Sequence, residues 1–120
     1  PHAMVGVMGA AADTDAEANH IFTSMQQSFV RLRRGTPDVF PPPVETMDAH
    51  WSEQERIMVE HTLKYAVVGG PQTIRRRIAD FLDLTKADEL IVSMPVFDME
   101  ARLKSLRLFA EAQQSLSLAA

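Results

Sequence analysis

A glycine-rich turn followed by a proline is the best candidate for ligand binding in this sequence. Gly69 and Gly70 precede Pro71, and proline is favoured at the first position of a helix. The backbone amides at a helix start lack partners within the helix and carry partial positive charge, so an anion such as a phosphate can dock against them. We therefore predict a ligand-binding site at Gly69, Gly70, Gln72 and Thr73. An ordinary loop-to-helix turn is the alternative interpretation of the same residues.

No other group of residues forms a recognised catalytic pattern. The chain has no cysteine, which excludes thiolate nucleophiles, cysteine-bound zinc and disulfides. None of its 4 histidines lies three or four residues from another, so no metal site is predicted. The run Arg75–Arg77 would fan across about 200° of a helix and is interpreted as a solvated face. Catalytic residues therefore stay unassigned.

The candidate turn must be positioned by buried strands and amphipathic helices. Met4–Ala11 is a continuously apolar run, typical of a strand that is buried on both faces of a parallel sheet. Thr14 and Glu17 match a capping box, which predicts a helix of about five turns that ends at Gly35. The acids Asp13 and Asp15 flank this helix start and are interpreted as cap and turn residues.

The rest of the chain predicts one further strand and three further helices. Ser52 and Glu55 form a second capping box, and Val67-Val68 interrupts the helical pattern before the glycine turn. Two parallel strands with about four helices predict an α/β fold whose sheet needs further cover on its faces and edges. The expected order is strand 4–11, helix 15–34, proline-rich connection 36–50, helix 53–65, helix from 71, strand 89–93 and helix 99–116.

Composition places the chain among ordinary globular domains. Its 120 residues and 13.4 kDa make residues 1–120 one small domain or a piece of a larger one. A net charge of -4 and a pI near 5.5 argue against a nucleic-acid partner. No apolar run approaches the ~20 residues of a membrane span and no signal peptide is visible, so we expect a cytoplasmic protein without membrane contact. The first methionine is Met4, after Pro1, so two interpretations stay open: the first residues are a cloning scar, or the chain is the tail of a longer polypeptide.

Short segments spread over nearly the whole chain follow one another in a familiar order and spacing. They are Val5–Val7, Ala11–Ala18, Phe22–Gln27, Leu32–Gly35, Pro41–Val44, Met47-Asp48, Trp51-Ser52, Val67–Ile74, Ala87–Val92 and Asp98–Leu106. Together they resemble the C-terminal part of luciferase-like, flavin-dependent monooxygenases. The resemblance rests on many modest matches rather than on one diagnostic motif.

The resemblance implies the C-terminal portion of an eight-stranded (β/α)8 barrel, with two of its parallel strands and its last helices. It implies reduced FMN as the cofactor, or a deazaflavin in some branches, together with dioxygen and a small organic substrate. It also implies that Gly69, Gly70, Gln72 and Thr73 lie at the rim of the flavin or substrate pocket. Because much of such a flavin site lies upstream, we expect the isolated chain to be inactive.

Three positions depart from the family's pattern. Many relatives carry a polar residue at the place of Met8, a serine or threonine at that of Gly70, and a tyrosine at that of Phe97. If those polar groups contact the ligand in the relatives, this chain has lost some of the contacts.

A non-catalytic α/β module that assembles with itself or docks on a partner is the second hypothesis. A sheet of two parallel strands leaves edges and apolar faces that dimerisation can bury. We expect a homo-oligomer under this hypothesis, and both hypotheses can hold for an isolated segment. A response-regulator-like or nucleotide-binding domain is disfavoured, because no phosphate loop follows the first strand and no acidic cluster is present.

Overall fold

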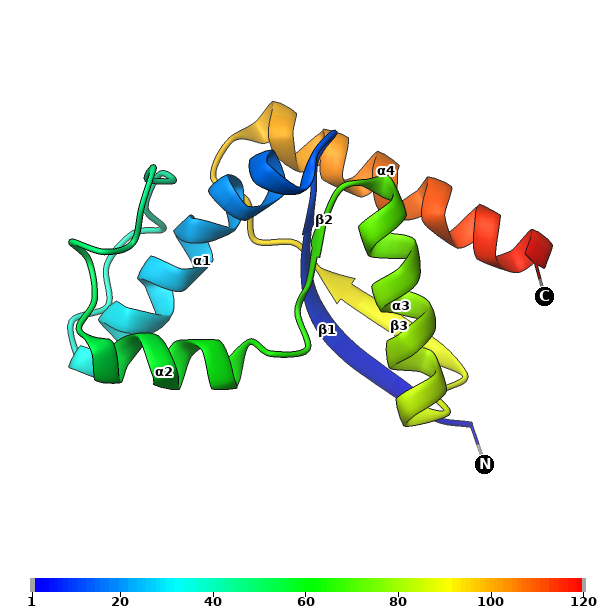
Figure 1. The fold of residues 1–120 in the computed structure, drawn as a ribbon, viewed down its shortest axis with the longest axis horizontal. Helices are drawn as coiled ribbons and strands as arrows, with labels where there is room; N and C mark the ends of the chain where they lie inside the picture. Colours follow the sequence, from blue (N-terminus) through cyan, green and yellow to red (C-terminus); the bar gives the residue numbers. More distant parts are fainter. Residues whose placement is uncertain (1, 120) are drawn as a thin grey trace.

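The computed structural model describes residues 2–119 as a parallel sheet flanked by helices (Figure 1). This arrangement confirms the predicted α/β class. The elements are β1 (Met4–Ala11), α1 (Asp15–Arg34), α2 (Glu53–Thr62), β2 (Val67–Gly69), α3 (Pro71–Thr85), β3 (Glu89–Ser93) and α4 (Met99–Ala119).

The sheet has three strands in the order β2-β1-β3, so β1 is central. The N-terminal part of β1, Met4–Met8, pairs in parallel with β3, and its C-terminal part, Gly9–Ala11, pairs in parallel with β2. The sequence predicted only two strands. The third, Val67–Gly69, is indicated in the sequence only as an interruption between helices, because three residues are too few to show a strand period.

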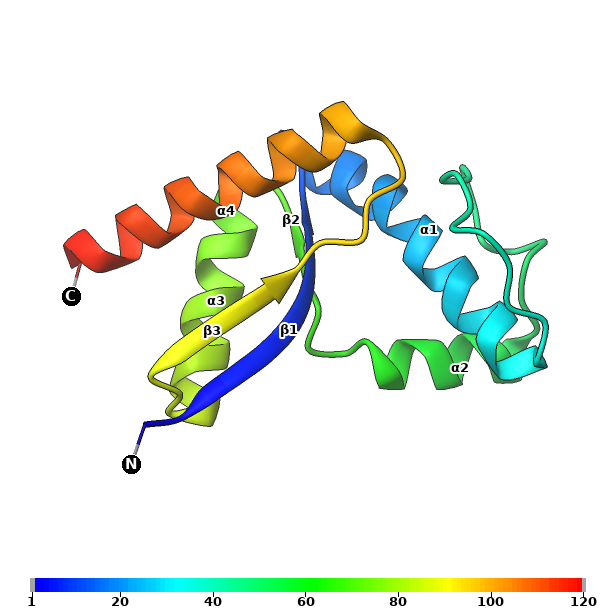
Figure 2. The same cartoon turned by 180° about the vertical axis from the view of Figure 1, so that it is seen from behind.

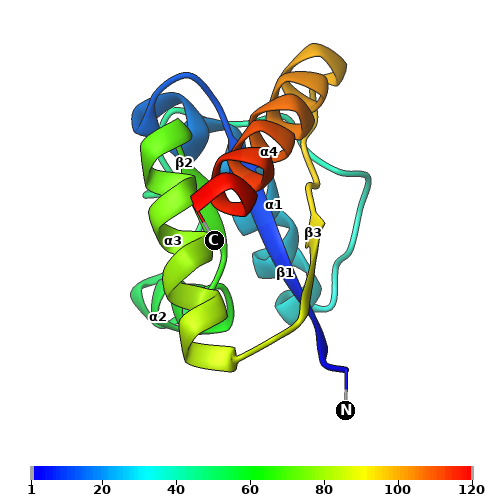
Figure 3. The same cartoon turned by 90° about the vertical axis from the view of Figure 1, so that its right-hand side faces the viewer.

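Helices cover the two faces of the sheet unequally. Ala11 and Val67 pack with Ile74 of α3 and Phe109 of α4 in one apolar cluster. The preceding residue of β1, Ala10, points to the opposite face, because successive side chains of a strand alternate. There it packs with residues of α1 in a second cluster, which includes Phe22 and Met25. Figure 3 shows α3 and α4 in front of the strands and α1 behind them.

Part of the α1 side of the sheet has no cover among residues 2–119. Figure 2 looks onto β1 and β3 from this side, with α3 lying behind them. Met4 is 55% exposed and Ile91 is 54% exposed, whereas Leu90 and Val92 pack against the cluster on the other face. We call this uncovered area, formed by Met4, Gly6, Ile91 and Ser93, the open face.

Local signals predicted most helix ends correctly. The Ser52–Glu55 capping box forms in both directions, and Gly35 adopts a left-handed φ of 75° at the end of α1. Thr14 accepts a hydrogen bond from the Glu17 amide, but the described residues lack the return bond from the Glu17 side chain. The helix α2 ends at Thr62 rather than near residue 65. None of the helices in residues 2–119 combines the length and the apolar character that a membrane crossing requires.

Gly9 is where β1 approaches its neighbours most closely. A Cβ atom added there would lie 2.6 Å from Cζ of Phe109, 3.0 Å from the Val67 carbonyl oxygen and 3.0 Å from Cγ1 of Val92. A Cβ atom on Gly6, in the same strand, would meet only the Ile91 carbonyl oxygen at 4.0 Å. The two glycines therefore form a matched pair for testing the packing.

We expect Gly9→Ala to lower the free energy of unfolding by about 1–3 kcal/mol, because the added methyl group overpacks the core. Gly6→Ala should be neutral or slightly stabilising, since alanine restricts the unfolded chain without a clash. Urea denaturation of both variants measures the difference. Equal stabilities would show that the core around Gly9 relaxes at no cost.

Candidate functional site

The predicted ligand-binding turn joins the end of β2 to the start of α3. Gly70 is the N-cap residue of α3, and Pro71 takes the first helical position as predicted. Gly70 has no side chain to cap the helix, and the first turn of α3 contains no acidic residue. Gly69 and Gly70 are buried, Thr73 is half-buried and Gln72 is exposed. The four predicted residues thus lie together at the C-terminal edge of the sheet.

A carboxylate of the chain itself occupies this helix start. The Gly70 amide donates a hydrogen bond of 2.7 Å to Oδ1 of Asp15, and the Thr73 hydroxyl donates one of 3.0 Å to Oδ2. Asp15 is the first residue of α1, so the contact joins the starts of two helices. In the sequence, Asp15 shows only the features of a cap or turn residue of its own helix, and nothing local indicates this longer-range role.

A side chain at position 69 would clash with its neighbours in this arrangement, which explains the glycine there. A Cβ atom there would lie 2.5 Å from Cγ2 of Thr73 and 2.8 Å from Oδ1 of Asp15. A Cβ atom on Gly70 would lie 3.2 Å from the Asp13 carbonyl oxygen, which is tight but less severe. Gly69 therefore allows the close approach of Asp15 and Thr73. This packing explains why a glycine stands at position 69, and no bound ligand is needed to explain it.

The surroundings of Asp15 favour its charged form. The hydrogen bond from the Gly70 amide lowers the pKa of the Asp15 carboxyl group below its usual value, and the Thr73 hydroxyl lowers it further. The positive charges of Arg76 and Arg77 act in the same direction. Asp15 is therefore an anion at neutral pH, held where a ligand phosphate was predicted to dock.

Two further contacts gather at the C-terminal end of β1. The Lys104 ammonium lies 2.5 Å from Oδ2 of Asp13, and the Ala11 amide donates a hydrogen bond of 2.9 Å to Oγ of Ser105. Ser105 is fully buried at 0% exposure. With the Asp15 contact, these bonds tie α1, α3 and α4 to one point, which we call the β1 junction.

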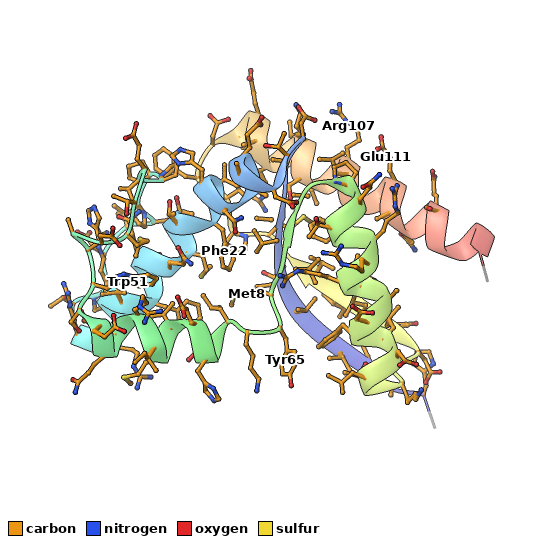
Figure 4. The ribbon with its side chains drawn as sticks, in the orientation of Figure 1. Met8, Phe22, Trp51, Tyr65, Arg107 and Glu111 are labelled. Carbon is orange, nitrogen blue, oxygen red and sulfur yellow. The ribbon has the colours of Figure 1, made fainter. Side chains whose placement is uncertain are left out.

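A hollow of about 350 Å³ opens beside the β1 junction, between α1, the end of α2 and α3. Phe22, Val59 and Val68 are among its apolar lining residues, and Phe22 belongs to the cluster that also holds Met8 (Figure 4). Arg76 and Arg77 both border the hollow, whereas Arg75 is absent from its lining. The three arginines therefore do not all face the same side of α3, as their helical spacing predicted.

The start of α3 does not fit the phosphate of a flavin in this arrangement. The Gly70 amide is already bonded to Asp15, and a second anion there would be repelled by the carboxylate. Among the four predicted residues, the exposed Gln72 is the one whose side chain remains directed to solvent. Among residues 2–119, no three His, Asp or Glu side chains gather as metal ligands.

The chain is similar in sequence and in structure to several known proteins. It is 43% identical to the uncharacterized protein YvbT of Bacillus subtilis over 92% of its length, and 40% identical to a luciferase-like monooxygenase of Escherichia coli over 97% of its length. The crystal structure of apo-MsnO8 superposes on 95% of the chain with a TM-score of 0.70 and 26% sequence identity. No family model matches the chain.

The resemblance to the luciferase-like monooxygenases is thereby confirmed, and this chain is homologous to a segment of a protein of that family. It spans about a third of the curated relatives that it matches, with 33% of YvbT and 35% of the Escherichia coli protein covered. It likewise covers 35% of the MsnO8 chain.

Ser105 and Ser24 are both fully buried on helices, but only Ser105 has a hydrogen-bond partner. We expect Ser105→Ala to lower the free energy of unfolding by about 1–3 kcal/mol, because the buried Ala11 amide loses its acceptor. Ser24→Ala should be neutral or stabilising, because its Oγ atom is buried without a partner. Thermal and urea unfolding of the two variants measure the contrast. A larger loss for Ser24→Ala would contradict this account of the β1 junction.

Proposed function

We propose that this chain is the C-terminal segment of a flavin-dependent monooxygenase, where it forms part of a (β/α)8 barrel. The observation that carries the proposal is the 40% identity to the luciferase-like monooxygenase of Escherichia coli, which extends over 97% of this chain and 35% of that protein. The open face and the outer edges of the parallel sheet support it, because strands of a closed barrel have neighbours on both sides.

In the proposed parent enzyme, reduced FMN would supply the electrons that activate dioxygen to oxygenate a small organic substrate, with a deazaflavin as the alternative cofactor. Gly69, Gly70, Gln72 and Thr73 would border the rim of the flavin or substrate pocket. Gly70 and Thr73 would line the pocket while their amide and hydroxyl groups stay bonded to Asp15. The exposed Gln72 would be the side chain free to contact a ligand. The flavin phosphate would be held by segments outside this chain.

Self-association is a second candidate function, favoured by the open face. A half-exposed methionine and isoleucine on an uncovered sheet face suit burial against a second copy of the chain. A cytoplasmic location without nucleic-acid or membrane partners is part of both proposals.

The intact mass of the natural gene product tests the segment proposal. We expect about three times 13.4 kDa, because the chain covers 33% to 35% of its relatives. A mass near 13.4 kDa would contradict the proposal.

Fluorescence titration with FMN then compares the full-length product with the 120-residue chain. We expect saturable binding by the full-length product and an affinity weaker than micromolar for the chain, which lacks the phosphate site. Absence of flavin binding by the full-length product would overturn the cofactor, and micromolar binding by the chain would show that its own residues suffice.

Sedimentation velocity over a dilution series tests self-association. We expect the chain to associate and Ile91→Lys to make it monomeric, because the charge would have to be buried in the contact. Ile57→Lys on α2 is the matched control, since Ile57 is 55% exposed and Ile91 is 54% exposed. A chain that is monomeric at all concentrations, or equal effects of the two substitutions, would exclude the open face as the contact.

A further inference from the structure

The carboxylate of Asp15 interacts with the starts of two helices, α1 and α3. It is the first residue of α1, where a negative charge is favourable to the helix dipole. Its oxygens also bond Gly70, the N-cap residue of α3, and Thr73, three residues further along. Both helix starts carry partial positive charge, so this carboxylate neutralises two of them at once.

The contact reproduces a capping box with a residue from another helix. In a capping box, the side chain three residues after the N-cap accepts a hydrogen bond from the N-cap amide. Thr73 stands at that position of α3, but its hydroxyl donates to Asp15, and Asp15 accepts the bond from the Gly70 amide. The acceptor that α3 lacks in its own first turn is thus supplied by α1.

The surrounding charges make this an anion position rather than a neutral polar contact. Arg76 and Arg77 both act on Asp15, and neither has an ion-pair partner among the described residues. Gly69 keeps the space that Asp15 and Thr73 fill. The position thus has an amide donor and a hydroxyl donor bonded to one carboxylate, and the charges of Arg76 and Arg77 also favour its ionised form.

We propose that Asp15 is a resident anion of this chain, which positions the start of α3 against the start of α1 and excludes phosphate and carboxylate groups of ligands from the Gly70 amide. The resident anion is a property of this chain by itself. Only its consequence, that a ligand at this rim presents an uncharged group, rests on the proposed function.

Rescue by an added anion separates this role from a merely structural one. Asp15→Ala empties the anion position, and Asp13→Ala is the matched control, because it removes an exposed carboxylate of the same turn that pairs with Lys104 instead. Urea unfolding of both variants and of the unmodified chain is measured with inorganic phosphate and with sodium chloride at equal ionic strength.

We expect phosphate to raise the folding equilibrium constant of Asp15→Ala by about tenfold at ten times its dissociation constant, because it binds the folded state alone. The unmodified chain and Asp13→Ala should gain nothing beyond the effect of sodium chloride. Equal stabilisation of all three chains, or no rescue of a folded Asp15→Ala chain, would overturn the proposal.

A measurement on the unmodified chain decides the matter if Asp15→Ala does not fold. The NMR signal of the Gly70 amide is followed while inorganic phosphate is added. A signal that stays in place supports the resident anion, because Asp15 keeps phosphate away from the amide. A saturable shift of the Gly70 signal, larger than that of the Gly35 amide at the end of α1, would overturn it.

Discussion

The hydrogen-bonded contact of Asp15 with Gly70 and Thr73 is the constraint on which the arrangement of this chain depends. It joins the starts of α1 and α3, which lie on opposite sides of the sheet. The segment that contains α1 and α2 is thereby fixed to the β2–α3 turn at the C-terminal edge of the sheet. Because the carboxylate is charged and accepts hydrogen bonds from two donors of α3, one side chain links the starts of both helices, which the apolar clusters pack against the sheet.

Small residues in β1 make this convergence of helices possible. Gly9, Ala10 and Ala11 occupy the half of the strand that pairs with β2, and all three are buried. Their short side chains let α1 approach one face while Phe109 and Ser105 of α4 approach the other. A strand with larger residues here would hold the three helices further apart, and the contacts of the β1 junction would not form together.

The sequence predicted the elements whose signals are local. The apolar run of β1, the cap at Ser52 and the Pro71 start of α3 all appear as expected. The contacts of Asp15 were missed because Gly70 and Thr73 lie 55 and 58 residues away along the chain. One signal was available, since α3 has a glycine at its N-cap and no acid in its first turn, so its first amides are open to an anion from elsewhere in the chain.

The divided pairing of β1 limits the length of any strand added beside it. On the edge that faces β2, only Gly9–Ala11 are paired, whereas Met4–Met8 bond with β3 on the other edge. A further strand that enters beside Met4 must end before it reaches Val67, the first residue of β2. It therefore has room for about five paired residues, or about 17 Å. Any longer strand at this position would have to bend out of the sheet or displace β2.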